Sequence, residues 1–348
     1  MRSLWSVFVV LAALPAWAGK ALILTAGDCA DAALIEASRD FRDSAAPLLP
    51  GGVFDARHVL DIVRPLPSRG TEDLERQVES ARTLFYGGQN ERALDLLERA
   101  LRELERADPE GRPWKLAESA LVLQAQVFKN LDRPRDATEA YRRVLRINPT
   151  LKLDAEAWAP SVLKEFEVVR KEVARTKKGN LMVRTDTSAT AIVVVDGQQL
   201  GTTPLRLELL PGSYHVALLQ GRSLSFPHRV EVPKEGTVVN IELSFEGAVS
   251  RAPPLCLATD DDGSATKLGQ LVGAEKVIVL RNSARGGPAF LLGALYDGST
   301  RQRTGSVTAG LARNLATFLV TGREQDGVRP LGSEPVAKAE PAPAAALV

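Results

Sequence analysis

The residues that could carry out chemistry in this chain are few, and the densest group of them is acidic. The run Asp260-Asp261-Asp262-Gly263 could offer carboxylate oxygens to Ca²⁺, which prefers such ligands. The alternating spacing and the distal glutamate of a helix–loop–helix calcium loop are missing. Carboxylates at this position would also cap a helix starting near Ser264, because they accept hydrogen bonds from its free N–H groups. We favour the capping role, so a metal-dependent hydrolase built on these aspartates is the weakest functional hypothesis.

The three histidines, His58, His215 and His228, lie in unlike sequence contexts. We expect no zinc site built from them and the two cysteines. On the expected strand 213–218, His215 has the opposite parity to the apolar positions, which predicts that its side chain faces solvent. The chain also lacks the Gly-x-Ser-x-Gly, phosphate-loop and His-Glu-x-x-His motifs. We therefore expect no catalytic residue, no cofactor and no bound metal, and a protein that is not an enzyme.

The first 18 residues have the pattern of a secretory signal peptide. Arg2 precedes an apolar run over Leu4–Leu14, and a small-x-small site follows at residues 16–18. The apolar run is shorter than the ~20 residues that span a bilayer, although an uncleaved anchor is the alternative. Cys29 lies well beyond the cleavage site and does not fit a lipid-acceptor position. We expect an exported, periplasmic or envelope-associated protein that is not a lipoprotein and has no transmembrane segment after cleavage.

The net charge and the two cysteines bear on the partners of the protein and on its covalent structure. The formal net charge is +1, and it becomes 0 once the predicted leader, whose only charged residue is Arg2, is removed. This balance gives no concentrated basic surface, so a nucleic-acid partner is not expected. The chain has two cysteines, and in an oxidising compartment a Cys29–Cys256 disulfide is predicted. Two free buried thiols are the alternative.

Residues 70–176, here called the helical block, have the apolar period of amphipathic helices. Thr71 is expected to be the N-cap of the first helix, and residues 159–175 are expected to form a capping helix after two helix pairs. Small and aromatic residues recur at matching offsets in the two pairs: Ala81 and Ala93 in the first, and Ala125, Phe128, Ala137, Tyr141 and Pro149 in the second. This pattern resembles tetratricopeptide repeats. The resemblance implies a surface that binds a peptide or protein; the alternative is a spacer that only packs on its neighbours.

Residues 179–247, here called the β module, alternate apolar and polar side chains in short runs, the last of them reaching Phe245. This pattern predicts a compact antiparallel β sandwich. Its turns are expected at six residues with structural roles: Asp196, Gly197, Gly201, Pro204, Pro211 and Gly212. As a set these residues resemble the PEGA domain, although residues 186–189, Asp-Thr-Ser-Ala, replace the Pro-Glu-Gly-Ala run of that family. The resemblance implies an envelope module without catalysis.

The two ends of the chain are each too small to bury a core alone, so residues 19–67 and 253–322 are predicted to form one split α/β domain. The first half is expected to hold a strand at 20–28, a helix, and a second strand at 58–63. The second half resembles the amino-terminal domains of TolB-like and curli-secretion-type envelope proteins, with Gly273-Ala274 before a buried strand and a hairpin at Asp297-Gly298. From residue 323 the chain is rich in proline and alanine and is expected to be a disordered tail.

The sequence thus predicts a multidomain α+β protein: a split α/β domain into which tetratricopeptide-like helices and a small β sandwich are inserted. The leading functional hypothesis is a non-enzymatic adaptor or scaffold of the cell envelope. Its helices would bind envelope proteins, and the β module would contact the envelope. The alternative is a protein that binds peptidoglycan or a surface glycan. Aromatic platforms for sugars are scarce, because Trp114 and Trp158 are the only tryptophans beyond the predicted leader.

Overall fold

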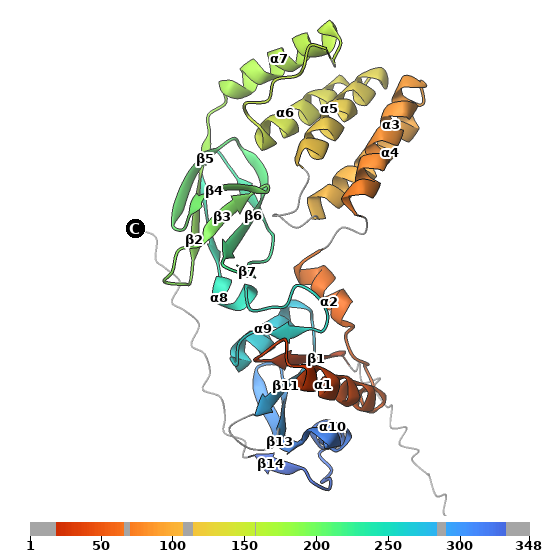
Figure 1. Ribbon diagram of the computed structural model, residues 1–348. Coiled ribbons are helices and arrows are strands. Elements are labelled where there is room, and N and C mark those ends of the chain that lie inside the picture. Colours follow the sequence, from red (N-terminus) through yellow and green to blue (C-terminus); the bar gives the residue numbers. More distant parts are fainter. Residues whose placement is uncertain (1–18, 66–69, 107–113, 157, 284–289, 332–348) are drawn as a thin grey trace, which may run out of the picture. The chain divides into compact units, whose positions relative to one another are not determined.

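The computed structural model describes residues 19–65, 70–106, 114–156, 158–283 and 290–331. The expected signal peptide and residues 332–348 of the expected tail lie outside this part of the chain. The protein is a multidomain α+β protein that divides into two compact units (Figure 1). One unit consists of residues 1–59 and 252–348 and is here called the sheet unit; the other consists of residues 60–251 and is here called the inserted unit. No helix in the described ranges is long and apolar enough to cross a membrane.

The sheet unit is built on one mixed six-stranded sheet in the order β10-β1-β11-β12-β13-β14. Its strands are β1 (Ala21–Ala26), β10 (Cys256–Leu257), β11 (Lys276–Ser283), β12 (Phe290–Asp297), β13 (Thr300–Thr308) and β14 (Arg329–Leu331). Strand β1 runs parallel to both β10 and β11, whereas the remaining pairs are antiparallel. All six residues of β1 are buried, as is typical of a parallel strand covered on both faces.

Helices α1 (Ala32–Ala45) and α10 (Ala312–Thr321) share one hydrophobic core with the sheet, while α9 (Asp262–Leu271) packs against β11. Two glycines let α10 approach closely. Gly293 on β12 lies directly opposite Gly305 on β13. A Cβ at Gly293 would lie 2.7 Å from Leu319 Cδ1, and one at Gly305 would lie 3.0 Å from Phe318 Cε1. Side chains at these two positions would therefore displace the helix.

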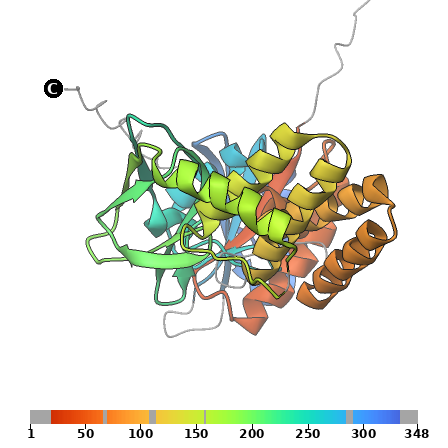
Figure 2. The same cartoon turned by 90° about the horizontal axis from the view of Figure 1, so that it is seen from above.

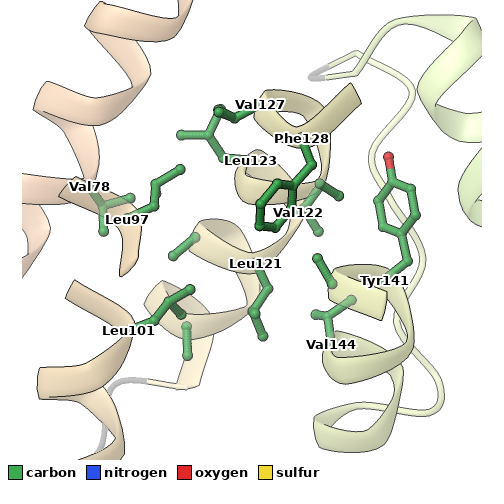
Figure 3. Close-up of a cluster of buried hydrophobic side chains, with 14 of the residues drawn as sticks. Val78, Leu97, Leu101, Leu121, Val122, Leu123, Val127, Phe128, Tyr141 and Val144 are labelled. Carbon is green, nitrogen blue, oxygen red and sulfur yellow. The ribbon is translucent and has the colours of Figure 1, made fainter. Parts of the chain in front are cut away.

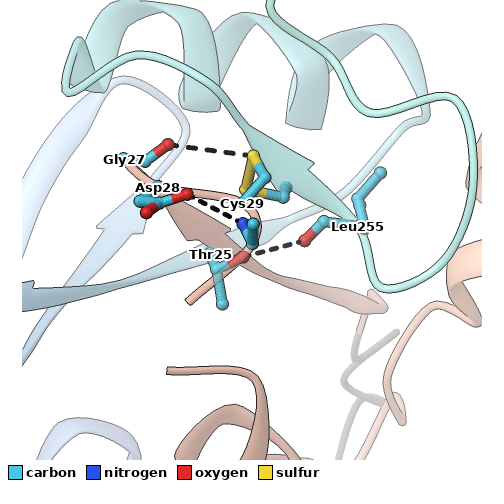
Figure 4. The surroundings of a disulfide bond; sticks show 7 residues. Thr25, Gly27, Asp28, Cys29 and Leu255 are labelled. Carbon is cyan, nitrogen blue, oxygen red and sulfur yellow. Dashed lines mark hydrogen bonds between the residues drawn. A yellow bond between two sulfur atoms is a disulfide. The ribbon is translucent and has the colours of Figure 1, made fainter. Parts of the chain in front are cut away.

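The predicted disulfide between Cys29 and Cys256 is confirmed (Figure 4). The two Cα atoms are 5.7 Å apart, although 227 positions separate the residues in sequence. The pairing of the strands explains this closeness, because Thr25 near the end of β1 lies opposite Cys256 on β10. The Thr25 hydroxyl also donates a hydrogen bond of 3.4 Å to the Leu255 carbonyl. The bond thus joins the two ends of the chain at adjacent strands of one sheet.

The helical block contains α3 (Thr71–Tyr86), α4 (Asn90–Arg106), α5 (Trp114–Asn130), α6 (Pro134–Ile147) and α7 (Pro160–Ala174). Consecutive helices pack against one another, and Figure 2 shows α3 and α4 lying side by side. Every residue from Ala120 to Phe128 on α5 is buried, so this helix is covered on all sides. Figure 3 shows Leu121 between Leu101 of α4 and Val144 of α6 in the common core.

The β module folds into two sheets that share one hydrophobic core, which includes Leu181, Val193 and Val216. One sheet has the order β5-β2-β9; the other has the order β4-β3-β6-β7, with β8 also paired to β6. The elements are β2 (Gly179–Thr185), β3 (Ile192–Val195), β4 (Gln198–Thr202), β5 (Leu205–Leu209), β6 (Gly212–Gln220), β7 (Ser223–Leu224), β8 (His228–Val232), β9 (Thr237–Ile241) and the short α8 (Leu243–Glu246).

The expectation of a second strand at 58–63 is wrong, because these residues belong to helix α2 (Ala56–Val63). The Asp55 carboxylate accepts a hydrogen bond of 2.8 Å from the Arg57 N–H, which is the action of an N-cap. The buried side chains of Val59, Leu60 and Val63 then fall on one helical face. A short apolar run that ends at a proline fits a strand or a helix equally well, and the capping aspartate favours the helix.

Three further expectations about the boundaries are corrected. Gly70 rather than Thr71 is the N-cap of α3. Strand β9 pairs with β2 in parallel, so the β module is not purely antiparallel, and the chain turns into α8 before Phe245. The first residues of the expected tail are not disordered, because β14 (Arg329–Leu331) pairs with the outer edge of β13. Proline is tolerated in β14 because this strand lies at the edge of the sheet.

We predict that the disulfide stabilises the sheet unit. Replacing both cysteines by alanine should lower the free energy of unfolding by about 2–4 kcal/mol, because the bond restricts the unfolded chain. Chemical denaturation followed by circular dichroism will measure this loss. Dithiothreitol serves as the control: it should weaken the parent protein to a similar extent and leave the double variant unchanged. Equal stability of the parent and the double variant would contradict the prediction.

Candidate functional site

The inserted unit contains a pocket of about 300 Å³ at which the helical block and the β module meet. It is here called the junction pocket. The ends of α4, α5 and α6 form its apolar wall, and strands β6 and β8 with the β3–β4 turn form most of its polar wall. The apolar wall consists of Leu101, Leu104, Ala117, Leu121 and Ile147, with the indole of Trp114 beside them. The polar wall consists of Glu105, Arg143, Arg146, Asp196, Ser213, His215 and Arg229.

Three close contacts hold the β module against the helices around this pocket. A Cβ built on Gly197 in the β3–β4 turn would overlap the indole of Trp114, so the turn lies directly against that ring. A Cβ on Gly212 would lie 2.8 Å from Arg146 Cδ, which places the aliphatic part of this arginine on the start of β6. The Gln198 side-chain amide donates a hydrogen bond of 3.0 Å to the Ile147 carbonyl. The two glycines therefore permit an approach that a side chain would block.

The turn residue Asp196 and the strand residue His215 form one polar group at the wall. The Asp196 carboxylate accepts a hydrogen bond of 2.9 Å from the His215 backbone N–H and lies 3.4 Å from the imidazole Nδ1. The side chains are only 13% and 23% exposed, respectively. The prediction that His215 faces solvent is therefore wrong: the opposite face of β6 is covered by the helices at this point.

Arginines from both sides contribute positive charge to the pocket. Arg143 on α6 forms an ion pair with Glu105 on α4, and Arg146 forms one of 3.0 Å with Glu139. On β8, Arg229 donates a hydrogen bond of 2.8 Å from Nε to the Ser213 hydroxyl. The wall thus carries three guanidinium groups and two carboxylates, from Glu105 and Asp196.

Behind the wall, Tyr214 fixes the strand that carries Ser213 and His215. Its hydroxyl donates a hydrogen bond of 2.7 Å to the Leu210 carbonyl. Burial raises the pKa of this phenol well above its ordinary value, with the nearby Arg146 opposing the shift and Asp196 adding to it. Tyr214 is therefore neutral at physiological pH and serves as a structural anchor.

The residues singled out from the sequence lie in turns of the β module and, apart from one proline, in the core of the helical block. In the β module, Asp196 and Gly197 have φ values of 47° and 82° and form the β3–β4 turn, while Gly201 and Gly212 have φ values of 153° and 152°. Pro204 follows β4, and Pro211 precedes β6. In the helical block the small and aromatic positions are buried, and only the proline is exposed: Ala81, Ala93, Ala125, Phe128, Ala137, Tyr141 and Pro149.

The sequence analysis missed Trp114, Arg146 and Arg229 as pocket residues, because they come from three distant segments. The other two histidines are not among the residues that line this pocket. His58 stacks on Phe54 with ring centroids 6.1 Å apart, and the imidazole Nε2 of His228 lies 2.8 Å from the buried Glu246 carboxylate. Nothing in the local sequence distinguishes a tryptophan or arginine at an interface between modules from one on a free surface.

The acidic run in the sheet unit has two separate roles. Asp261 is the N-cap of α9 and accepts hydrogen bonds from the N–H groups of Gly263 and Ser264, as predicted. Asp262 forms ion pairs with Arg281 and Arg301 and accepts a hydrogen bond from the Tyr296 hydroxyl. These carboxylates are thus bound to groups of the protein itself.

The environment of Asp262 shifts the pKa of two groups. Partial burial alone would raise the pKa of this carboxyl, but the hydrogen bond from Tyr296 and the charges of Arg281 and Arg301 lower it below its ordinary value. Burial and the same carboxylate raise the pKa of Tyr296 to about 12.

The described residues include no group of three or more His, Cys, Asp or Glu side chains placed to hold a metal ion.

We predict that Gly197→Ala destabilises the inserted unit more than Gly221→Ala does. Both glycines have positive φ, of 82° and 60°, so both substitutions strain the backbone. Only the Cβ at Gly197 would overlap a side chain, that of Trp114; Gly221 has open space. The difference in the free energy of unfolding should be about 1–3 kcal/mol, the usual effect of overpacking. In a protein that also carries Trp114→Ala, the two glycine substitutions should lower the free energy of unfolding equally. Equal losses when Trp114 is present would contradict the contact.

We also predict that Asp262→Asn lowers stability in a pH-dependent way. Because the pKa of Asp262 is depressed in the folded protein, its contribution is complete above the ordinary aspartate pKa of about 4 and is lost as the pH falls below that value. The variant should lose about 1.5–3 kcal/mol at pH 7, the range for hydrogen bonds to charged groups. Urea unfolding from pH 7 to pH 2.5 will measure it, and a deficit that stays constant over this range would contradict the assignment.

Comparison with known proteins gives one match. No curated protein and no solved structure matches the chain. The family model of the PEGA domain matches residues 178–248, which is the β module with one residue added at each end. This confirms the resemblance for that segment, and the chain therefore contains a PEGA domain.

Proposed function

We propose that this protein is a non-enzymatic adaptor of the cell envelope, whose helical block and PEGA domain together bind a partner. The junction pocket carries this proposal, because both modules contribute to one wall with apolar and cationic parts. A pocket that is lined by hydrophobic side chains and a few convergent polar groups is typical of a binding site. The disulfide supports an exported protein, since such bonds persist in oxidising compartments.

We also propose the finer domain assignments. Helices α3–α6 are two tetratricopeptide-like repeats, and α7 caps them. The buried alanines on α3–α6 support this assignment, because small residues are needed where paired helices cross. The PEGA domain is a small β sandwich. Residues 19–67 and 253–322 form a split α/β domain similar to the amino-terminal domain of TolB-like proteins; the pairing of β1 with β10 and β11 supports it.

Binding of peptidoglycan or a surface glycan is the alternative function. The observation that favours it is Trp114, whose indole lies beside the apolar wall and could stack on a sugar ring. A hydrolase built on the acidic run is less favoured, because Asp261 and Asp262 are bound to helix N–H groups and arginines. We retain the adaptor as the leading hypothesis.

Site-specific crosslinking tests the adaptor. A photoreactive residue at Ser213 in the pocket should crosslink to a discrete envelope protein in living cells, and Arg146→Gln should abolish that product. The same residue at Arg206, an exposed position on β5 outside the pocket, is the control. Crosslinks that are equal at both positions, or absent from both, would contradict the proposal.

Co-sedimentation with purified peptidoglycan sacculi tests the alternative. If the main activity is glycan binding, the full protein should pellet with sacculi, and Trp114→Phe should pellet less. Muropeptides released by muramidase should compete. If Trp114→Phe pellets as well as the parent, the pocket does not take part in wall binding. If neither protein pellets, glycan binding is wrong and a protein partner is the expected ligand.

A further inference from the structure

Two guanidinium groups in the junction pocket keep N–H groups that their described contacts do not use. The Asp196 carboxylate is engaged by the His215 N–H, and Glu105 is engaged by Arg143. Among the described residues, Arg146 uses one terminal nitrogen on Glu139. Since each guanidinium has five N–H groups in a fixed plane, Arg146 retains donors that a ligand could use.

Arg229 retains even more of its capacity than Arg146 does. In the described part of the chain it donates only from Nε, to the Ser213 hydroxyl, and no carboxylate pairs with it. Two planar cations from different modules, Arg146 on α6 and Arg229 on β8, therefore line the same pocket with N–H groups in reserve. Planar guanidinium groups match the two oxygens of a carboxylate particularly well.

The remaining wall is apolar and comes from the helices. Trp114 and Ile147 line the pocket and are partly exposed, whereas Leu104 and Leu121 beside them are buried, with exposed fractions of 1% and 0%. A ligand that satisfies this site must place an apolar group and an anion close together. A volume of about 300 Å³ is at the lower limit for small-molecule pockets, so one or two small residues fit but a long acyl chain does not.

We propose that the junction pocket binds the C-terminal residue of a peptide, with its carboxylate at Arg146 and Arg229 and its side chain against Trp114 and Ile147. A terminal carboxylate and a side chain are attached to the same Cα, so a single residue presents both halves of the required ligand. This inference rests on the proposed adaptor function and names the chemistry that the partner presents.

Two sources supply this chemistry: the C-terminus of a protein, made of L-residues, and a stem peptide of the cell wall, which ends in D-alanine. Fluorescence anisotropy with the full protein can separate them. The first probe is an N-terminally labelled peptide ending in Ala-Ala-Leu with a free carboxylate, the second is the same peptide with a C-terminal amide, and the third ends in D-Ala-D-Ala. Preference for the first or the third identifies the source, and either result supports the pocket.

The carboxylate should bind at least about tenfold more tightly than the amide, which is the effect expected from charge-assisted hydrogen bonds. Arg229→Gln and Arg146→Gln should each reduce the affinity for the carboxylate by a similar factor while leaving that for the amide unchanged. Arg206→Gln is the matched control: Arg206 is also exposed and also donates from Nε to one side-chain oxygen, that of Asn180, but lies outside the pocket. It should bind like the parent.

The inference would be overturned by no saturable binding of either carboxylate probe, by equal binding of acid and amide, or by unchanged binding in both pocket variants. Displacement of the probe by inorganic phosphate at equal concentration would also overturn it, because the apolar wall would then contribute nothing. If the probes fail while the Ser213 crosslink persists, the ligand chemistry is wrong and the adaptor function stands. If both fail, the proposed function fails as well.

Discussion

The pairing of β1 with two strands from the far end of the chain is the constraint on which the sheet unit depends. Strand β1 lies between β10 and β11, and all six of its residues are buried. Residues 19–59 supply only this one strand to the sheet, so they cannot satisfy its backbone groups alone. The sheet is complete only after the second half of the chain has been added, and the disulfide then joins the segment after β1 to the first residue of β10. Long-range closure of this kind has a large entropy cost, which the buried strand and the covalent bond offset.

Local periodicity was sufficient to predict most elements whose sequence pattern is long. Helices α4 and α6 have well-separated apolar faces, and the disulfide followed from the cysteines and the expected compartment. The failures occurred where the pattern was short. Residues 58–63 form an apolar run of strand length, and only the preceding Asp55 indicates the helix. Strand β14 (Arg329–Leu331) has no buried face, because all three of its residues are exposed. It forms because the edge of β13 is free to pair with it, and the local sequence gives no sign of that edge.

The candidate site was beyond the reach of sequence reasoning for a related reason. The turn at Asp196 and Gly197 was predicted correctly from its residue types, but its position against Trp114 depends on how two modules pack. Parity along β6 correctly placed Tyr214 and Val216 in the core of the β module. It then assigned His215 to solvent by assuming that the second face of the sheet is free. In the inserted unit this face of β6 lies toward α4, α5 and α6, so the His215 side chain lines a pocket instead of facing solvent.

The groups on the polar wall of that pocket differ in what they can do chemically. A general base needs a carboxylate or imidazole that is open to a substrate. Glu105 is paired with Arg143, whereas Asp196 accepts the His215 N–H and lies 3.4 Å from the His215 imidazole, which also lines the pocket. Arg146 and Arg229, by contrast, are cations that do not lose a proton in proteins. Such groups hold and orient an anion but transfer no proton to or from it. Since one of them belongs to the helical block and the other to the PEGA domain, a ligand between them would stabilise the contact of the two modules, and the modules would gain affinity from being joined in one chain.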